Sequence, residues 1–186
     1  MSHHQILWRR VDVVGLDACR LQRLAAAAGW QLSGSAIYHE DGVLAQVHYD
    51  VRHDQNWRTQ SCRVTGWANG DPIDLSIVRD VNLGWMVNEQ KVEGLDDALD
   101  VDLGFTPATN TTAIRRLGLS EGEKAQAKAA WLNTDTWSLQ PLLQSYERLG
   151  EDRFQYVSLA SGFSAELVVN AAGLVTDYPG IWVQDA

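Results

Sequence analysis

Short runs in which apolar and polar residues alternate restrict the fold of this chain more than any other feature. After the turn signature Asp41 and Gly42, every second residue from Val43 to Val51 is apolar. Similar runs recur about every 8–12 residues, separated by Gly, Asn and Asp, as at Asn69 and Gly70. Side chains point alternately to the two faces of a β-strand, so the pattern predicts an antiparallel sheet of many strands.

Residues 15–30 are harder to assign. Leucines and alanines in this segment fit a short helix, whereas Cys19, Leu21 and Arg23 alternate with their neighbours as in a strand. The segment has neither a good helix-capping residue nor a long apolar face with helical spacing. A pair of strands is therefore the preferred interpretation.

The clearest helix signal begins at Ser120. Ser120 and Glu123 have the spacing of a capping box, and the following residues to Leu132 are mostly strong helix formers. A sheet of more than about ten strands tends to curl or split, and a helix over residues 121–132 could lie on its concave side. We expect one domain over residues 1–186, mainly β: a large curved antiparallel sheet, or half-barrel, wrapped around one α-helix.

The charge of the chain argues against two classes of partner. The net charge of −9 would repel nucleic acid and anionic membrane surfaces. No apolar run approaches the length of a membrane span, and the N-terminal residues lack the features of a secretory signal. Cys19 and Cys62 match no metal spacing and are expected to be free, strand-borne and buried. These features predict a cytoplasmic protein that does not insert into membranes.

Signals for catalysis or cofactor binding are weak. The nearest match to a serine nucleophile motif, residues 162–166, ends in Glu166 instead of glycine. The histidines His39, His48 and His53 do not have metal-ligand spacing, and no glycine-rich phosphate loop occurs. We therefore expect no catalytic residue, no metal and no cofactor, and we favour a binding protein over an enzyme.

Tryptophan is unusually frequent, with eight residues in the chain. Trp and Tyr suit surfaces that are apolar on one side and wet on the other, and carbohydrates and lipid headgroups meet such surfaces. The alternative is that the tryptophans simply fill the core of the sheet.

Residues 100–117 hold the polar groups that are hardest to explain as generic structure. Asp100 and Asp102 would share one face of a strand, where they could bind a cation, serve in acid–base chemistry or pair with an arginine. The Thr and Asn residues of 109–112 could cap turns or bond to the hydroxyls of a ligand. Arg115 and Arg116 could clamp an anionic group or pair with an aspartate.

This central segment resembles the core of the putative glycolipid-binding family, a bacterial domain of formerly unknown function. The matching segments are residues 100–103, 106–111, 114–117, 6–10, 29–30, 49–59, 141–149 and 174–180. Thr112 and Ala113 depart from the Leu-Pro expected there. The resemblance implies a many-stranded half-barrel around a helix, similar to bacterial lipoprotein carriers, and it implies binding without catalysis.

We therefore expect a lipid or glycolipid-like amphiphile to bind in the concave groove. Its acyl part would lie over Trp85, Trp131 and Tyr146, and its head would meet Asp102, Asn110 and one of the two arginines. The candidate ligand-binding residues are Asp100, Asp102, Thr109, Asn110, Arg115, Arg116, Trp85, Trp131 and Tyr146. The alternatives are an enzyme for a small hydrophobic substrate, with Asp100 or Asp102 as the acid–base group, and a structural or interaction domain with no ligand.

Overall fold

The computed structural model describes residues 3–25 and 29–185, and its main element is one sheet of 15 strands. The first eight strands are β1 (His3–Arg10), β2 (Val14–Arg23), β3 (Trp30–Glu40), β4 (Val43–His53), β5 (Thr59–Ala68), β6 (Asp71–Asp80), β7 (Gly84–Val87) and β8 (Gln90–Lys91). The other seven are β9 (Asp100–Leu103), β10 (Lys124–Asn133), β11 (Ser138–Arg148), β12 (Arg153–Ser158), β13 (Ser164–Val169), β14 (Val175–Tyr178) and β15 (Trp182–Gln184).

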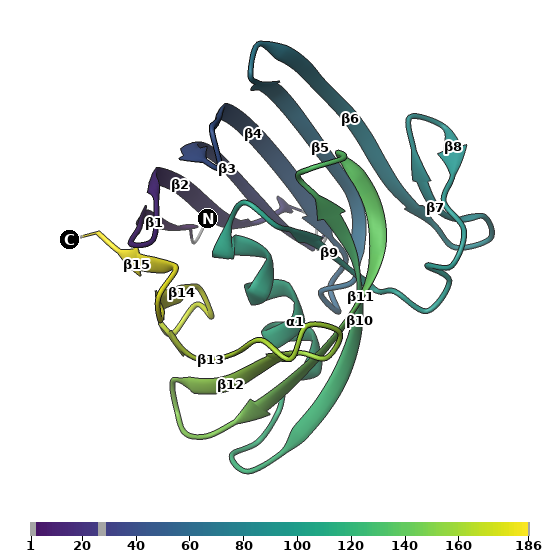
Figure 1. Cartoon of the computed structure of the whole chain (residues 1–186). Coiled ribbons are helices and arrows are strands. Elements are labelled where there is room, and N and C mark those ends of the chain that lie inside the picture. Colours follow the sequence, from purple (N-terminus) through teal and green to yellow (C-terminus); the bar gives the residue numbers. More distant parts are fainter. Residues whose placement is uncertain (1–2, 26–28, 186) are drawn as a thin grey trace.

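The strand order across the sheet is β8-β7-β6-β5-β4-β3-β2-β1-β15-β14-β13-β12-β11-β10-β9. All neighbours are antiparallel except β9, which runs parallel to β10. The sheet curls around a short helical segment, which lies between the strands of the two halves of the chain (Figure 1). Its curl also brings β9 to the start of β5, where the Thr59 amide donates to the Leu99 carbonyl at 2.9 Å. The predicted mainly β fold with a curved, unclosed sheet is confirmed.

The first and last strands meet in the middle of this sheet. Trp8 of β1 lies opposite Gln184 of β15, and Arg10 lies opposite Trp182. Two further backbone hydrogen bonds extend the pairing, one of them from the Val11 amide to the Ile181 carbonyl at 2.9 Å. This contact joins the N-terminal meander, strands β1–β8, to the C-terminal meander, strands β10–β15.

The local signals explain the strands well. On β4 the apolar positions Ala45, Val47 and Val51 are fully buried, and the polar residues between them lie on the other face. At the predicted turn before β4, Asp41 and Gly42 both have positive φ, as the two central residues of a type I′ hairpin turn require. In the ambiguous segment, residues 15–23 belong to β2 and Trp30 begins β3, so the preferred pair of strands is confirmed, and residues 26–28 lie outside the described part.

The position of the helix was predicted wrongly. Residues 124–132 lie in strand β10, and the α-helix is α1 (Asn110–Leu117), preceded by the 3-10 helix η2 (Pro107–Thr109). The capping-box contact does form, with the Ser120 amide donating to the Glu123 carboxylate at 2.7 Å, but it closes a turn before the strand. Helix propensity is a weak preference, and β10 pairs along both of its edges, with β9 and β11.

Tertiary contacts hold the short helix in its place. The side chain of Thr106 caps η2 by accepting from the Ala108 amide at 3.1 Å, and Gly118 ends α1 in a left-handed conformation. The first five residues of α1 are buried although Thr and Asn favour helices little. Burial inside the curved sheet therefore stabilises a helix that its own sequence would not form.

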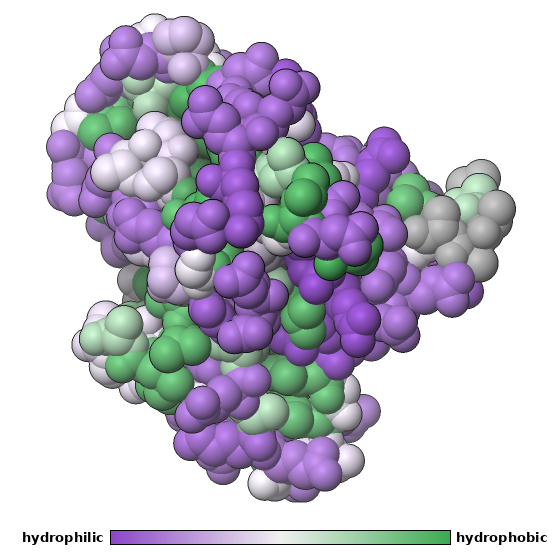
Figure 2. Space-filling view, turned by 90° about the vertical axis from the view of Figure 1, so that its right-hand side faces the viewer, coloured by the Kyte–Doolittle hydropathy of each residue, from purple (hydrophilic) through white to green (hydrophobic). Residues whose placement is uncertain are grey.

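The buried side chains form two clusters on the concave side of the sheet. The larger cluster includes Trp8 and Trp85 from the N-terminal meander, and the smaller one includes Tyr146 and Leu167 from the C-terminal one. Cys19 and Cys62 are free and buried, as predicted. No helix within residues 3–25 and 29–185 is long and apolar enough to cross a membrane. On the side of the molecule in Figure 2, apolar residues occur in small groups between polar ones.

Candidate functional site

A cavity of about 390 Å³ lies beside the helical segment. Its wall includes residues of η2 and α1, of strands β9, β10, β11, β12, β14 and β15, and of the turn between β12 and β13. This volume is within the range of pockets that hold small ligands. The curl of the sheet therefore leaves a hollow next to the polar segment that the sequence singled out.

Asp102 of β9 is the acidic group of this cavity. Burial raises the pKa of Asp102 to about 6, and the neighbouring carboxylate of Asp100 acts in the same direction. The hydrogen bond that Gln144 donates to the carboxylate opposes this shift. No Lys, Arg or His lies among the described residues that line the cavity, so the carboxylate has no cation beside it there.

Aromatic side chains form much of the remaining wall. They are Trp131, Tyr156, Phe163, Tyr178 and Trp182. The rings of Tyr156, Phe163 and Tyr178 pack together, with centroids 6.1 to 6.4 Å apart. Phe163 is 40% exposed and therefore stands at the outer edge of the cluster. Such a wall offers both apolar area and aromatic π-systems.

Trp131 approaches the backbone closely at Gly104. A Cβ atom at position 104 would lie 2.8 Å from the indole Nε1 of Trp131. Glycine at this position therefore lets the indole lie against the end of β9, where it forms part of the cavity wall.

Asn110 also lines the cavity and ties α1 to the sheet. Its side-chain amide donates to the hydroxyl of Tyr146 at 3.0 Å. Gln144, which bonds Asp102, also donates to the hydroxyl of Tyr156 at 3.3 Å. These contacts fix the polar groups of the cavity from strands β11 and β12.

Asp100 and the two arginines have structural partners. Asp100 is buried and accepts two hydrogen bonds from Arg116, at 2.7 and 2.6 Å. Arg115 donates to the carbonyls of Ala171 and Ala172 in the turn before β14. Pairing of an aspartate with one of these arginines is confirmed, and none of the three side chains lines the cavity.

Three other predicted residues lie outside the cavity lining. Trp85 is 1% exposed and donates through Nε1 to the Ala98 carbonyl at 3.0 Å. Tyr146 is equally buried, below Asn110. The hydroxyl of Thr109 accepts from the Leu103 amide at 3.1 Å, which links η2 to β9. Of the predicted residues, the structure brings Asp102, Asn110 and Trp131 together in the cavity wall.

A buried polar group that the sequence analysis overlooked holds η2 in position. The carboxylate of Asp17 accepts hydrogen bonds from the hydroxyls of Thr106 and Tyr49, the latter at 2.9 Å. Farther along, in α1, the hydroxyl of Thr112 lies 2.9 Å from Nε2 of His53. Burial lowers the pKa of His53 to about 4. Asp17 and His53 stand in regular alternating strands, and nothing in those patterns marks them as partners of the helix.

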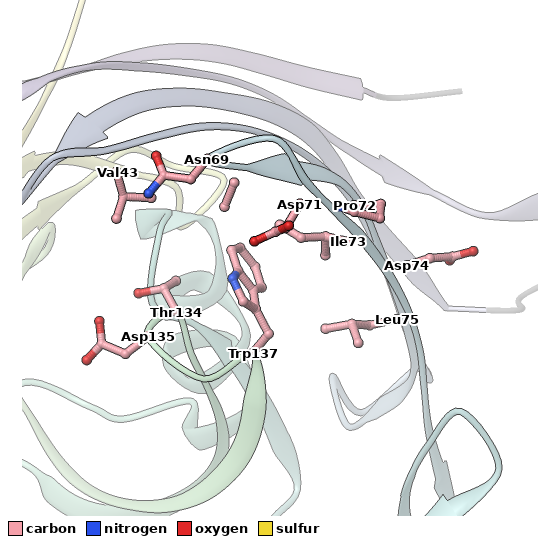
Figure 3. Close-up of a pocket in the computed structure, with 11 residues that line it drawn as sticks. Val43, Asn69, Asp71, Pro72, Ile73, Asp74, Leu75, Thr134, Asp135 and Trp137 are labelled. Atoms are coloured by element: carbon pink, nitrogen blue, oxygen red, sulfur yellow. The ribbon is translucent and has the colours of Figure 1, made fainter.

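A second cavity of about 510 Å³ lies between two turns at another rim of the sheet. Figure 3 shows Trp137 rising from the turn after β10 towards Asp71 and Ile73 of β6. Asp135 lies in the same turn as Trp137 and is exposed. Among the described residues, no group of three or more His, Cys, Asp or Glu side chains could hold a metal ion in this cavity or elsewhere.

The sheet, the enclosed helix and the first cavity together define a class: half-barrel-like β proteins with a ligand-sized hollow. Residues 5–184 match the model of the family described as "Putative glycolipid-binding", so the chain belongs to that family. A DUF1089 family protein from Pseudomonas aeruginosa has a similar crystal structure, with a TM-score of 0.79, 28% identity and 90% of each chain covered.

A more distant likeness concerns the fold alone. The "Beta-barrel-like Protein of Domain of Unknown Function DUF1849" from Brucella abortus has a TM-score of 0.50 and 7% identity, over 98% of this chain and 93% of that one. No curated protein matched this sequence.

Proposed function

We propose that this protein binds a lipid or glycolipid-like amphiphile in the cavity beside α1, without catalysis. The carrying observation is the composition of the cavity wall, which combines the carboxylate of Asp102 and the amide of Asn110 with a cluster of aromatic rings. Amphiphiles need both kinds of surface, and a rigid hollow reduces the cost of ordering them. The family description agrees with this proposal.

The ligand itself can be sought with protein purified from its own host under mild conditions. Native mass spectrometry should detect a retained molecule that dissociates on denaturation. A chain that carries nothing, and that binds none of a panel of lipids and glycolipids added later, would contradict the proposal.

A cavity-filling variant tests whether the ligand binds in this cavity. Ala160 lines the cavity from an exposed turn, so Ala160→Trp adds bulk to the hollow without disturbing a strand. Leu143 lies 48% exposed on β11 and outside the cavity lining, so Leu143→Trp adds an indole elsewhere. Only the first variant should lose the ligand. Equal retention by both variants would place the ligand elsewhere.

An enzyme for a small hydrophobic substrate is the second candidate. The observation in its favour is Asp102, a carboxyl group in a cavity with its pKa raised to about 6. Asp100 suits this role less, because Arg116 holds both of its oxygens. Turnover of chromogenic esters or glycosides that disappears in Asp102→Asn would support this candidate and overturn the non-catalytic proposal.

A further inference from the structure

Asp102 is the one ionised side chain among the described residues that line the cavity beside α1. Tyr156 and Tyr178 are its other titratable neighbours in the wall, and burial raises the pKa of both phenols, so they stay neutral. The guanidinium of Arg10 lies behind one ring of this wall, 5.3 Å from the ring centroid of Trp182. Arg10 is neutralised by Asp12 and Glu40, with N···O distances of 2.6 and 2.7 Å.

This balance of charge disfavours an anionic head. A phosphate or sulfate placed in the cavity would meet the Asp102 carboxylate and no lining cation. A neutral polyol could donate hydrogen bonds to the carboxylate, as Gln144 does, but it would bring no opposite charge to this partly buried group.

A cation would interact favourably with both the carboxylate and the aromatic rings of the cavity wall. It would pair with the carboxylate, and it would also be attracted by the π-systems of Trp131, Tyr156 and Tyr178, whose rings line the same cavity. Carboxylates combined with several aromatic rings are the side-chain set that recognises quaternary ammonium groups. The ring cluster of Tyr156, Phe163 and Tyr178 is already packed, so little ordering is needed when such a group binds.

We infer that the polar group recognised in this cavity is an alkylammonium cation, held by the Asp102 carboxylate and the surrounding aromatic faces. The inference rests on the proposed amphiphile-binding function and specifies the chemistry of the head. The same group could belong to an amphiphile or to a small soluble amine, and the experiment must separate these sources.

Two amphiphiles with the same chain make the central comparison. Isothermal titration calorimetry of the whole chain, below the micelle concentrations, would compare dodecyltrimethylammonium with dodecyl maltoside at pH 8. The cationic head should bind about tenfold more tightly, because it adds a charge pair and ring contacts. Equal or weaker binding than the maltoside would overturn the inference and leave the amphiphile proposal standing. Binding of neither would overturn both.

Choline and its neutral tert-butyl analogue test the head without a chain. Choline should bind more weakly than dodecyltrimethylammonium but more tightly than the neutral analogue. Choline binding as tight as that of the amphiphile would support alkylammonium recognition and overturn the amphiphile as its source. Equal binding of choline and its neutral analogue would contradict the inference.

A matched pair of variants locates the effect. Asp102→Asn removes the carboxylate from the cavity, and Asp135→Asn removes the same charge from the exposed turn beside the second cavity. The ratio of cation to maltoside affinity should fall from about ten to about one in the first variant and stay unchanged in the second. Circular dichroism and thermal unfolding establish that both variants fold. A ratio that falls equally in both would show a general effect of net charge and overturn the inference.

Discussion

Asp17 on β2 accepts a hydrogen bond from the hydroxyl of Thr106, the residue that caps η2, across 89 positions of sequence. Tyr49 of β4 donates to the same carboxylate. The helical segment therefore begins at a point fixed by two strands of the N-terminal meander. The same contacts fix one wall of the cavity, because Thr106 and Pro107 both line it.

The buried carboxylate of Asp17 should make the stability of the fold depend on pH. Burial raises the pKa of Asp17 to about 6, from about 3.9 in an unfolded chain. The folded state thus binds this proton more tightly, so the free energy of unfolding should fall by up to about 3 kcal/mol as the pH rises from about 4 to about 6. Urea unfolding across this range should show a smaller fall in Asp17→Asn. Parallel curves for the two proteins would contradict the assignment.

The ion pair of Asp100 and Arg116 should contribute strongly to stability. Arg116→Leu leaves a carboxylate of 2% exposure without its partner, which should cost about 3–5 kcal/mol. Arg153→Leu breaks an exposed pair with Glu166 and should cost at most about 1 kcal/mol. Chemical unfolding at neutral pH measures both losses. Similar small losses would show that the Asp100 pair is not structurally important.

Replacement of Gly104 should affect the ligand more than the fold. Gly104→Ala places a methyl group 2.8 Å from the present position of the Trp131 Nε1, so the indole must move within the cavity wall. The affinity for an amphiphile should fall about tenfold, with a loss of stability of about 1 kcal/mol. At Gly150 an added Cβ meets nothing closer than 3.9 Å, so Gly150→Ala is the control and should bind normally. Calorimetry and thermal unfolding distinguish the two effects.

Binding of an alkylammonium ligand should also depend on pH. Asp102 loses its charge below its pKa of about 6, so the affinity for dodecyltrimethylammonium should fall as the pH drops from 7 to 5. Asp100 on the same strand and the phenols of Tyr146, Tyr156 and Tyr178 face this group, and the carboxylate of Asp100 is held by Arg116. Asp102→Asn should bind weakly at every pH. A steep pH dependence that persists in this variant would assign the titration to another group.

The strands could be predicted because their signal is local. On β4 each apolar side chain from Ala45 to Val51 occupies the buried face that alternation gives it. At β10 the prediction followed helix propensity instead, although Ala125, Ala127 and Ala129 also alternate with Gln126 and Lys128. The alternation was the better guide, because pairing on both edges outweighs the preference of single residues.

The helix and most of the cavity could not be predicted in this way. α1 contains Thr111 and Thr112, which are poor helix formers, and it exists because the sheet encloses it. Asp102, Asn110 and Trp131 were found because polar groups and tryptophans are conspicuous in sequence. Tyr156 and Tyr178 were missed because they stand in ordinary strands, and only the curl of the sheet brings them to β9.

The pairing of β1 with β15 has a consequence for how the protein forms in the cell. Trp8 finds its partner Gln184 only after the chain has left the ribosome as far as residue 184. Until then the N-terminal meander exposes the open edge of β1, which invites pairing with other molecules. The pairing of β1 with β15 joins residues very far apart in the sequence. The time needed to synthesise the intervening chain therefore sets the earliest moment at which the sheet can be completed.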